Sequence, residues 1–186
     1  MASNATIFKA TIQIADMDRH YYEDHTLTLA RHPSETDERM MVRLLAFVLH
    51  AHEALSFGRG LSAEEEPAPW HKDLTGTIER WIEVGQPEEK AIRRACGRAK
   101  RVCIYTYGGR GADQWWEKNM ATLERFNNLA VTNLPLDGSR ALATLAQPSM
   151  QLQCTIQEGQ IWMADGENTA HIALTILKGA SAPFGQ

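Results

Sequence analysis

The 186-residue sequence has few cysteines and no C-x-x-C pair. Its three cysteines, Cys96, Cys103 and Cys154, leave one over in any pairing, which argues against a disulfide framework and against a zinc ribbon. Two of them, Cys96 and Cys103, stand among apolar residues, where a cysteine behaves as a small hydrophobic side chain. Free thiols indicate a reducing compartment, so we expect a cytoplasmic protein.

Long hydrophobic runs are also missing. The longest uncharged apolar stretch, residues 44–51, is interrupted by His50, whereas a membrane-spanning helix needs about 20 such residues. The N-terminal residues do not combine a basic patch, an apolar run and a small-residue cleavage site. The sequence therefore predicts a soluble protein with no membrane partner.

The overall composition is that of a globular protein, with 44% hydrophobic and 23% charged residues. The length and the lack of repeats predict a single domain over residues 1–186. Charge is uneven: residues 1–90 carry 9 basic and 16 acidic residues (net −7), and residues 91–186 carry 10 and 7 (net +3). This polarity indicates an anionic partner on one side of the domain and a cation on the other.

Hydrophobic periodicity predicts an α/β domain with one mixed sheet. Alternating residues predict strands at 8–14, 27–29 and 78–84, and an apolar run predicts a buried strand at 102–107. A helix is expected from the N-cap Ser34 to residue 55, followed by a surface loop at 57–73. Further helices are expected at 88–99 and 112–125, and further strands at 129–134, 150–157, 160–164 and 170–177. An N-terminal hairpin and a C-terminal meander flank the centre, where strand–helix–strand order implies parallel pairing.

Acidic residues supply the first candidate site. In strand 78–84 we expect Ile78, Ile82 and Val84 on the buried face and Glu79, Trp81 and Glu83 on the other. Glu79 and Glu83 stand about 13 Å apart along a strand, too far to bind one ion. A metal site at Glu83 therefore needs acids from other elements, and the candidates are Glu38, Glu65, Glu66 and Asp73. Two alternatives stay open, namely that Glu38 only favours the helix dipole and that the acids of residues 64–66 only solvate a loop.

A basic segment supplies the second candidate. Residues 90–112 contain no acid but seven cations, Lys90, Arg93, Arg94, Arg98, Lys100, Arg101 and Arg110. Four of them, Lys90, Arg94, Arg98 and Arg101, recur at helical spacing and could follow a phosphate backbone. A basic helix face that serves only solubility explains the pattern equally well.

The glycines between strand 102–107 and the next helix, Gly108–Gly111, form the third candidate. Glycine-rich turns at this position can bind phosphate at a helix N-terminus. No Gly-Lys-Ser/Thr follows and no third glycine completes a dinucleotide motif, so a simple turn is the competing interpretation.

Several blocks of the sequence closely resemble the YaeQ family. They are RHPSET (31–36), ERMM (38–41), FGRGL (57–61), EEEPAPW (64–70), WIEVGQP (81–87) and YTYGGR (105–110). The resemblance covers nearly the whole chain and implies a variant of the PD-(D/E)XK nuclease fold. Glu38 then matches the acid of the first helix, Glu83 the acid of the acid-x-lysine motif, and Glu65, Glu66 or Asp73 the remaining acid. Gly85 stands where that motif has its lysine, so Gln86, Lys90 or Lys100 would have to replace it.

Two functions follow from the resemblance and the charges. The first is a phosphodiesterase (nuclease) that uses Mg²⁺ or Mn²⁺ at Glu38, Glu83 and Glu65 or Glu66, with nucleic acid as its partner. The second is a catalytically degenerate nuclease-like module that binds nucleic acid or an acidic protein through Arg94, Arg98, Lys100 and Arg101. The family has also been linked to transcription, which this sequence neither supports nor excludes. Nothing in the sequence indicates an oligomeric state.

Overall fold

The computed structural model describes residues 4–51, 55–56 and 70–180 and contains two β-sheets and four helices in this part of the chain. The helices are α1 (Asp37–Leu49), α2 (Glu89–Arg98), α3 (Arg110–Leu123) and α4 (Leu136–Ala143). The strands are β1 (Thr6–Asp16), β2 (Tyr21–Arg31), β3 (Leu55–Ser56), β4 (Trp70–Lys72), β5 (Ile78–Val84), β6 (Ala99–Thr106), β7 (Leu129–Asn133), β8 (Ser149–Gln157), β9 (Gln160–Ala164), β10 (Thr169–Ala173) and β11 (Thr175–Lys178).

Sheet A is five-stranded, in the order β10-β9-β8-β1-β2. Strands β1 and β2 form the expected hairpin, and β8, β9 and β10 form the expected antiparallel meander. Parallel pairing of β1 with β8 joins the N-terminal hairpin to the C-terminal meander, and Ile12 lies opposite Leu152 in this pairing. Alternation is strict in both central strands, so Ala10, Ile12 and Ile14 face the core and their neighbours face outward.

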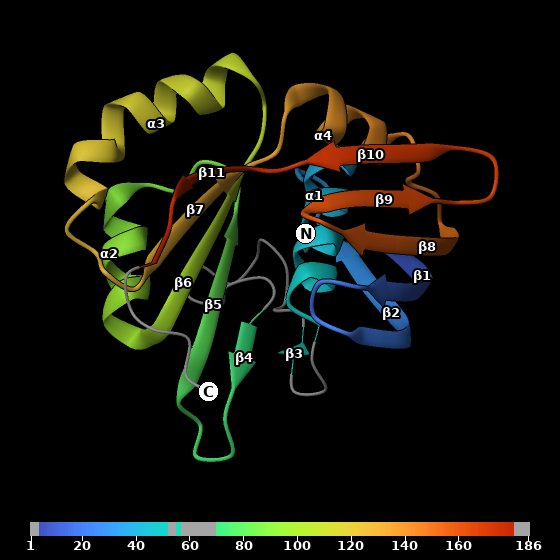
Figure 1. Cartoon of the computed structure of the whole chain (residues 1–186), viewed down its shortest axis with the longest axis horizontal. Coiled ribbons are helices and arrows are strands. Elements are labelled where there is room, and N and C mark those ends of the chain that lie inside the picture. Colours follow the sequence, from blue (N-terminus) through green and yellow to red (C-terminus); the bar gives the residue numbers. More distant parts are fainter. Residues whose placement is uncertain (1–3, 52–54, 57–69, 181–186) are drawn as a thin grey trace.

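Sheet B is six-stranded, in the order β11-β7-β6-β5-β4-β3. Strands β5, β6 and β7 are parallel and are joined by α2 and α3, which lie on the same side of the sheet in Figure 1. Strands β4 and β11 pair antiparallel on either side of this centre. The carboxyl ends of β5 and β6 therefore lie side by side, which is where open α/β sheets bind ligands.

Helix α1 lies between the two sheets (Figure 1). All nine residues from Met40 to Val48 are buried, because one side of the helix packs on sheet A and the other on sheet B. Thr36 caps the helix, and its side chain accepts a hydrogen bond from the backbone N–H of Arg39. On sheet B this core includes Ile82, Val84, Cys103 and Tyr105.

A second core fills the opposite face of sheet B, under α2 and α3. It contains Trp81, Ile92, Val102, Ile104 and Leu129, with Trp115 and Trp116 partly buried at its border. Because sheet B is covered on both faces, β6 is buried on both sides, as its apolar sequence predicted. No helix in the described residues is long and apolar enough to cross a membrane.

The α/β class is confirmed, and the single mixed sheet is corrected to two. The helix expected from Ser34 to residue 55 begins after Thr36 and ends at Leu49. Helix α4 was not predicted, and β11 leaves the meander to join sheet B. Ile78 was expected beside Ile82, but a bulge between β4 and β5 turns it toward the Trp81 core.

Candidate functional site

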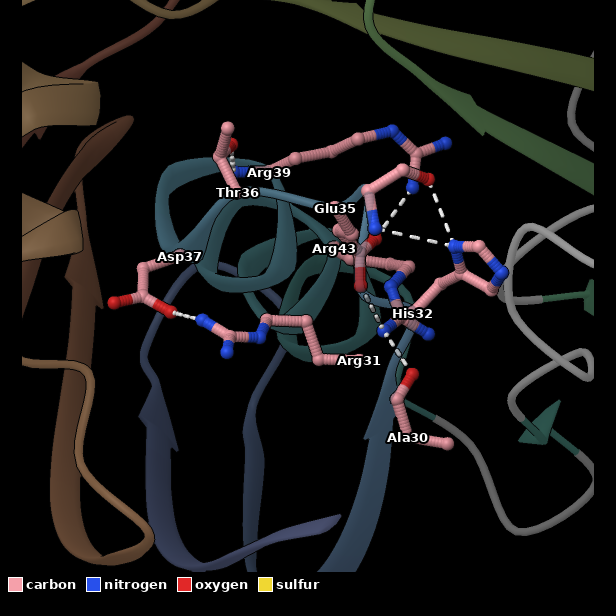
Figure 2. A network of polar contacts seen from close by, with 9 residues as sticks. Ala30, Arg31, His32, Glu35, Thr36, Asp37, Arg39 and Arg43 are labelled. Carbon is pink, nitrogen blue, oxygen red and sulfur yellow. Dashed lines mark hydrogen bonds and ion pairs between the residues drawn. The ribbon is translucent and has the colours of Figure 1, made fainter. Parts of the chain in front are cut away.

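A charged network joins the end of β2 to the start of α1 (Figure 2). The Glu35 carboxylate, with a side chain that is 0% exposed, accepts hydrogen bonds from Arg39 at 2.5 Å and from Arg43 at 2.9 Å. Arg43 also donates to the carbonyl oxygen of Ala30 at 3.0 Å. Arg31 pairs with Asp37 and lies over the ring of Phe8. The first turn of α1 is thus fixed to sheet A by charges.

The Glu35–Arg43 pair lies deep in the protein, since the Arg43 side chain is only 1% exposed. Desolvation lowers the pKa of Arg43, and the Glu35 carboxylate opposes that change. Removing one partner would leave a buried charge without compensation. The pair therefore fixes the position of α1, and with it the direction in which Glu38 and Arg39 project.

Tyr107 connects this network to sheet B. It follows the carboxyl end of β6 and lies close enough to the first turn of α1 for the charges of Arg39 and Glu38 to act on its hydroxyl. Burial raises the pKa of Tyr107, and the nearby Arg39 guanidinium lowers it. The start of α1 and the carboxyl edge of β5 and β6 therefore form one neighbourhood.

Glu83 lies near the end of β5 in the same neighbourhood. Its Oε1 atom accepts a hydrogen bond from Trp81 Nε1 at 2.9 Å. Burial raises the pKa of Glu83, and the Trp81 bond and the Arg39 charge only partly oppose this. A half-buried carboxylate with a raised pKa at the carboxyl edge of a parallel sheet is a recognised sign of a functional site.

The Glu83 environment predicts a specific dependence of stability on pH. Because the folded-state pKa lies above the unfolded value, the folded protein holds the proton more tightly, and stability falls as pH rises between the two pKa values. Glu83→Gln removes this loss and keeps the acceptor for Trp81. Denaturant unfolding from acid to neutral pH should show equal stability at the acid end and a variant at least as stable as wild type at neutral pH. A variant that is less stable at neutral pH would contradict this account.

The acids predicted to surround Glu83 do not converge among the described residues. Glu83 shares its face of β5 with Trp81 and lies opposite Ile104, whereas α1, with Glu38, packs on the face of Ile82 and Val84. Asp73 lies beyond the other end of β5, where its carboxylate accepts hydrogen bonds from the Thr75 hydroxyl and from the backbone N–H groups of Thr75 and Thr77, which hold its pKa at about 2. No group of three or more His, Cys, Asp or Glu that could hold a metal ion occurs in the described residues.

Two further acids, Glu65 and Glu66, lie outside the described residues. Glu83 accepts a hydrogen bond from the Trp81 indole and feels the charge of the Arg39 guanidinium, so the described part of the chain does not form the acid-lined cleft expected there. Of the proposed lysine replacements, Lys100 pairs with Glu79 at 2.5 Å, and Gln86 and Lys90 are exposed. Gln86 donates a long hydrogen bond, 3.5 Å, to the carbonyl of Tyr107.

The basic segment is divided by the fold. Arg101 belongs to β6 and lies near His50 and Cys103 on the α1 face of sheet B, so it does not continue a helical stripe. Arg98 lies over the Trp81 ring at 5.6 Å. The outer face of α2 nevertheless carries four exposed cations, Lys90, Arg93, Arg94 and Arg98, opposite the buried Ile92 and Ala95. We call these four residues with Gly97 the α2 cationic face.

Ion pairs neutralise only some of the cations on the α2 cationic face. Arg93 binds Glu89 at 2.5 Å, and Arg125 binds the same carboxylate at 3.2 Å. Among the described residues, neither Lys90 nor Arg94 has an acidic partner. Gly97 lies between the arginines, and nothing comes within 4 Å of the position its Cβ would take. An exposed glycine inside a helix costs about 0.5–1 kcal/mol relative to alanine, and neither packing nor backbone conformation requires it here.

The Gly108–Gly111 turn is explained by the packing of the chain itself. Gly108 and Gly109 have φ values of 108° and 62°, which favour glycine. A Cβ on Gly109 would stand 3.2 Å from the Leu136 side chain, and one on Gly111 would stand 3.5 Å from Gln86 Nε2. These contacts fill the turn at the start of α3 and support the simple-turn interpretation over a nucleotide site.

The Glu35–Arg43 pair was missed by the sequence analysis, although the sequence carried a signal. Arg43 is the only charged residue in the run from Met40 to Val48. A helix that is apolar on all sides is buried, so a cation within it requires an acid nearby. Glu35, two turns earlier and just before the helix, was the available partner.

Comparison with known proteins places these features in a family. The family model described as YaeQ protein matches residues 1–174. The chain is 46% identical to "Uncharacterized protein YaeQ" of Escherichia coli (strain K12) over 175 residues, covering 94% of this chain and 97% of that protein. It is 48% identical to the protein of the same name from Salmonella typhi over 176 residues, with the same coverage of each chain.

Two crystal structures have the same fold. The YaeQ protein from Xanthomonas axonopodis pv. citri superposes with a TM-score of 0.90 at 44% identity, covering 94% of this chain and 98% of that chain. The YaeQ protein from Pseudomonas syringae gives a TM-score of 0.90 at 35% identity, covering 96% and 98%. Sequence and fold agree over almost the full length of each relative, and the chain therefore belongs to the YaeQ family.

Proposed function

We propose that this protein binds the phosphodiester backbone of nucleic acid through the α2 cationic face. The observation that supports it most directly is the combination of unpaired Lys90 and Arg94 with the bare Gly97 on one exposed surface. Cations without acidic partners gain most from phosphate, because they release counterions without breaking an ion pair. Gly97 lets a sugar–phosphate chain approach the helix more closely than any side chain would allow.

Salt dependence tests this proposal directly. We assume that three of the four cations of the α2 cationic face each contact one phosphate of duplex DNA. The logarithm of the affinity should then fall with the logarithm of the salt concentration with a slope of about −2.7. Fluorescence anisotropy with a labelled duplex should therefore show a roughly 40-fold loss of affinity between about 50 and 200 mM salt. A single-stranded probe and an RNA hairpin measured in parallel identify the preferred form. Binding that does not change with salt, or no binding at about 50 mM salt, would refute the proposal.

Gly97 allows a second test in which stability and binding change in opposite directions. Gly97→Ala should raise the free energy of unfolding by about 0.5–1 kcal/mol, because alanine is the better helix former and has free space here. The same methyl group occupies the surface that the backbone of the ligand approaches, so the affinity for the duplex should fall. A variant that is more stable and binds equally well would show that the glycine has no part in binding.

A divalent-metal-dependent phosphodiesterase of the PD-(D/E)XK type is the second candidate. It is supported by the position of Glu83 and by the raised pKa of its carboxyl group. Glu83, with Glu65 or Glu66, would hold Mg²⁺ or Mn²⁺, which polarises a phosphodiester and activates water when bound. Glu38 is set aside as a ligand of the same ion, because α1 packs on the other face of β5.

Metal binding is checked by thermal unfolding with and without Mg²⁺ or Mn²⁺. A metal held by Glu83 must raise the melting temperature of the wild-type protein and must not raise that of Glu83→Gln. Equal shifts in both proteins, or none in either, would exclude Glu83 as a ligand and leave the non-catalytic binding function alone.

A further inference from the structure

No helix of the described residues covers the outer face of sheet A, because α1 and α4 both lie on its other side (Figure 1). Alternation in the two central strands turns Leu152 and Cys154 toward the core and leaves amides and hydroxyls outside. Thr11 lies opposite Gln151, and Gln13 lies opposite Gln153. The centre of this face therefore contains polar side chains without charge.

This face is hollowed beside the turn between β9 and β10. One hollow of about 210 Å³ is lined by side chains of β1 and β8, including Gln13, Gln151 and Gln153, and by Asp165 from the turn. A neighbouring hollow of about 240 Å³ shares Gln151 and Asp165 and extends to Ser149 and Glu167. The two form a shallow groove along β8, which we call the sheet A groove.

The glutamine amides of the groove are free of side-chain hydrogen bonds within the described residues. Each of the three amides offers both donors and an acceptor. The Asp165 carboxylate is held in place by the backbone N–H groups of Glu167 and Asn168, which lower its pKa. No cation lines either hollow in the described residues. The groove therefore suits a neutral ligand with many hydroxyl groups, and its two carboxylates disfavour a phosphate except at the end where Lys9 lies opposite Ser149.

An aromatic platform stands next to the groove. Trp162 lies on β9 two residues before Ala164, which lines the first hollow, and its side chain is on the same outer face. His171 stacks on the indole with ring centroids 5.2 Å apart and an interplanar angle of 20°, and a 2.7 Å hydrogen bond to Gln160 fixes the imidazole. His171 lies on the β10 side of the indole, and on the other side Trp162 faces the small Thr155 of β8, so part of the ring stays exposed to a ligand. Trp162 is 37% exposed, although the inward-facing residues beside it are buried.

We infer that the sheet A groove binds a neutral oligosaccharide. One sugar ring stacks on Trp162, and the hydroxyl groups of the next ring bind Gln13, Gln151, Gln153 and Asp165. The aromatic surface supplies apolar contact area, and the amides and carboxylate match hydroxyls that both donate and accept. A nucleic-acid strand would also stack on Trp162, but its phosphates would face Asp165 and Glu167. This inference is independent of the α2 cationic face, which lies on the other sheet.

The test uses the whole protein and defined saccharides. Maltohexaose, cellohexaose and chitohexaose are titrated by isothermal calorimetry, and side-chain amide signals are followed by NMR. Because the groove is shallow, we expect a dissociation constant on the order of 1 mM for the preferred saccharide. Trp162→Ala and Gln151→Ala should each weaken binding at least tenfold. Gln157→Ala is the matched control, since Gln157 is an exposed glutamine on the same strand and face but lines neither hollow.

Each possible result of the saccharide titrations either supports or overturns the inference. Saccharide binding that is lost in Trp162→Ala and Gln151→Ala and kept in Gln157→Ala supports the inference. No heat and no amide shifts with any of the three saccharides at about 10 mM would overturn it. Equal binding by all variants would also overturn it, because the sugar would then sit elsewhere. A single-stranded oligonucleotide that binds in place of the saccharides and depends on Trp162 would replace it with base stacking.

Discussion

Arg43→Met is expected to lower the free energy of unfolding by about 3–5 kcal/mol, the cost of breaking a buried ion pair by removing one partner. The Glu35 carboxylate is 0% exposed and would keep only its bond to Arg39, while the bond from Arg43 to the Ala30 carbonyl would also be lost. Methionine fills most of the space of the arginine stem, so a cavity contributes little. Equilibrium unfolding in urea, followed by circular dichroism, measures the change.

Two controls separate charge from packing in this experiment. Arg93→Met removes an i, i+4 ion pair of the same kind at a side chain that is 60% exposed, and it should change stability by no more than about 0.5 kcal/mol. Arg43→Met combined with Glu35→Leu removes both buried charges and should recover most of the loss. A loss below about 1 kcal/mol in the single variant, or a double variant as unstable as the single one, would show that the pair is not compensated as the geometry indicates.

The elements with strong local signals were predictable from sequence. Strand β5 was predicted with its observed bounds, 78–84, and α2, α3 and β9 were placed within two residues, because alternation, glycines and prolines mark them clearly. Thr36 was overlooked as the N-cap of α1 because Ser34, after Pro33, is an equally good cap by type. Which of the two caps the helix depends on the hydrogen bond to Arg39, a local geometry that composition does not reveal.

The division into two sheets depends on contacts that are distant in sequence. Pairing of β1 with β8 joins residues such as Ile12 and Leu152, and neither strand carries a mark that selects its partner. Strand β11 follows β10 closely, yet it pairs with β7 in the other sheet. Such pairings follow from the burial of α1 between the sheets, so they become predictable only once that helix is known to be apolar on all sides.

The position of Glu83 near the carboxyl end of β5 agrees with the predicted strand, and its role in a site stays a prediction. Its hydrogen-bond partner, Trp81, is two residues away on the same face, which alternation predicted, although that face is covered rather than open. The four residues Lys90, Arg94, Arg98 and Arg101 were grouped by helical spacing, but the helix ends at Arg98. Beyond that point the chain is a strand, and the period changes from 3.6 to 2, which turns Arg101 to the far side of the sheet.

The largest functional effect is expected from reversing Lys90 and Arg94, the two cations of the α2 cationic face that have no acidic partner among the described residues. Lys90 and Arg94 lie one helical turn apart on the exposed side, so both can contact the same phosphate strand. Lys90→Glu with Arg94→Glu should weaken duplex binding by roughly 100-fold or more, if each contact is worth at least about 1.4 kcal/mol. The salt slope should fall by about 2, one unit for each lost contact. Both quantities come from anisotropy titrations at several salt concentrations.

The matched control for this variant changes the net charge equally on other surfaces. Lys9→Glu with Arg140→Glu also lowers the charge by four, but these exposed residues lie on sheet A and α4. A nucleic-acid surface formed by α2 requires the control to bind within about threefold of wild type, because screening at about 0.15 M salt limits long-range effects to roughly 8 Å. If both double variants lose affinity equally, the binding reflects net charge alone. If neither does, nucleic acid binds elsewhere or not at all, and the α2 cationic face serves only solubility.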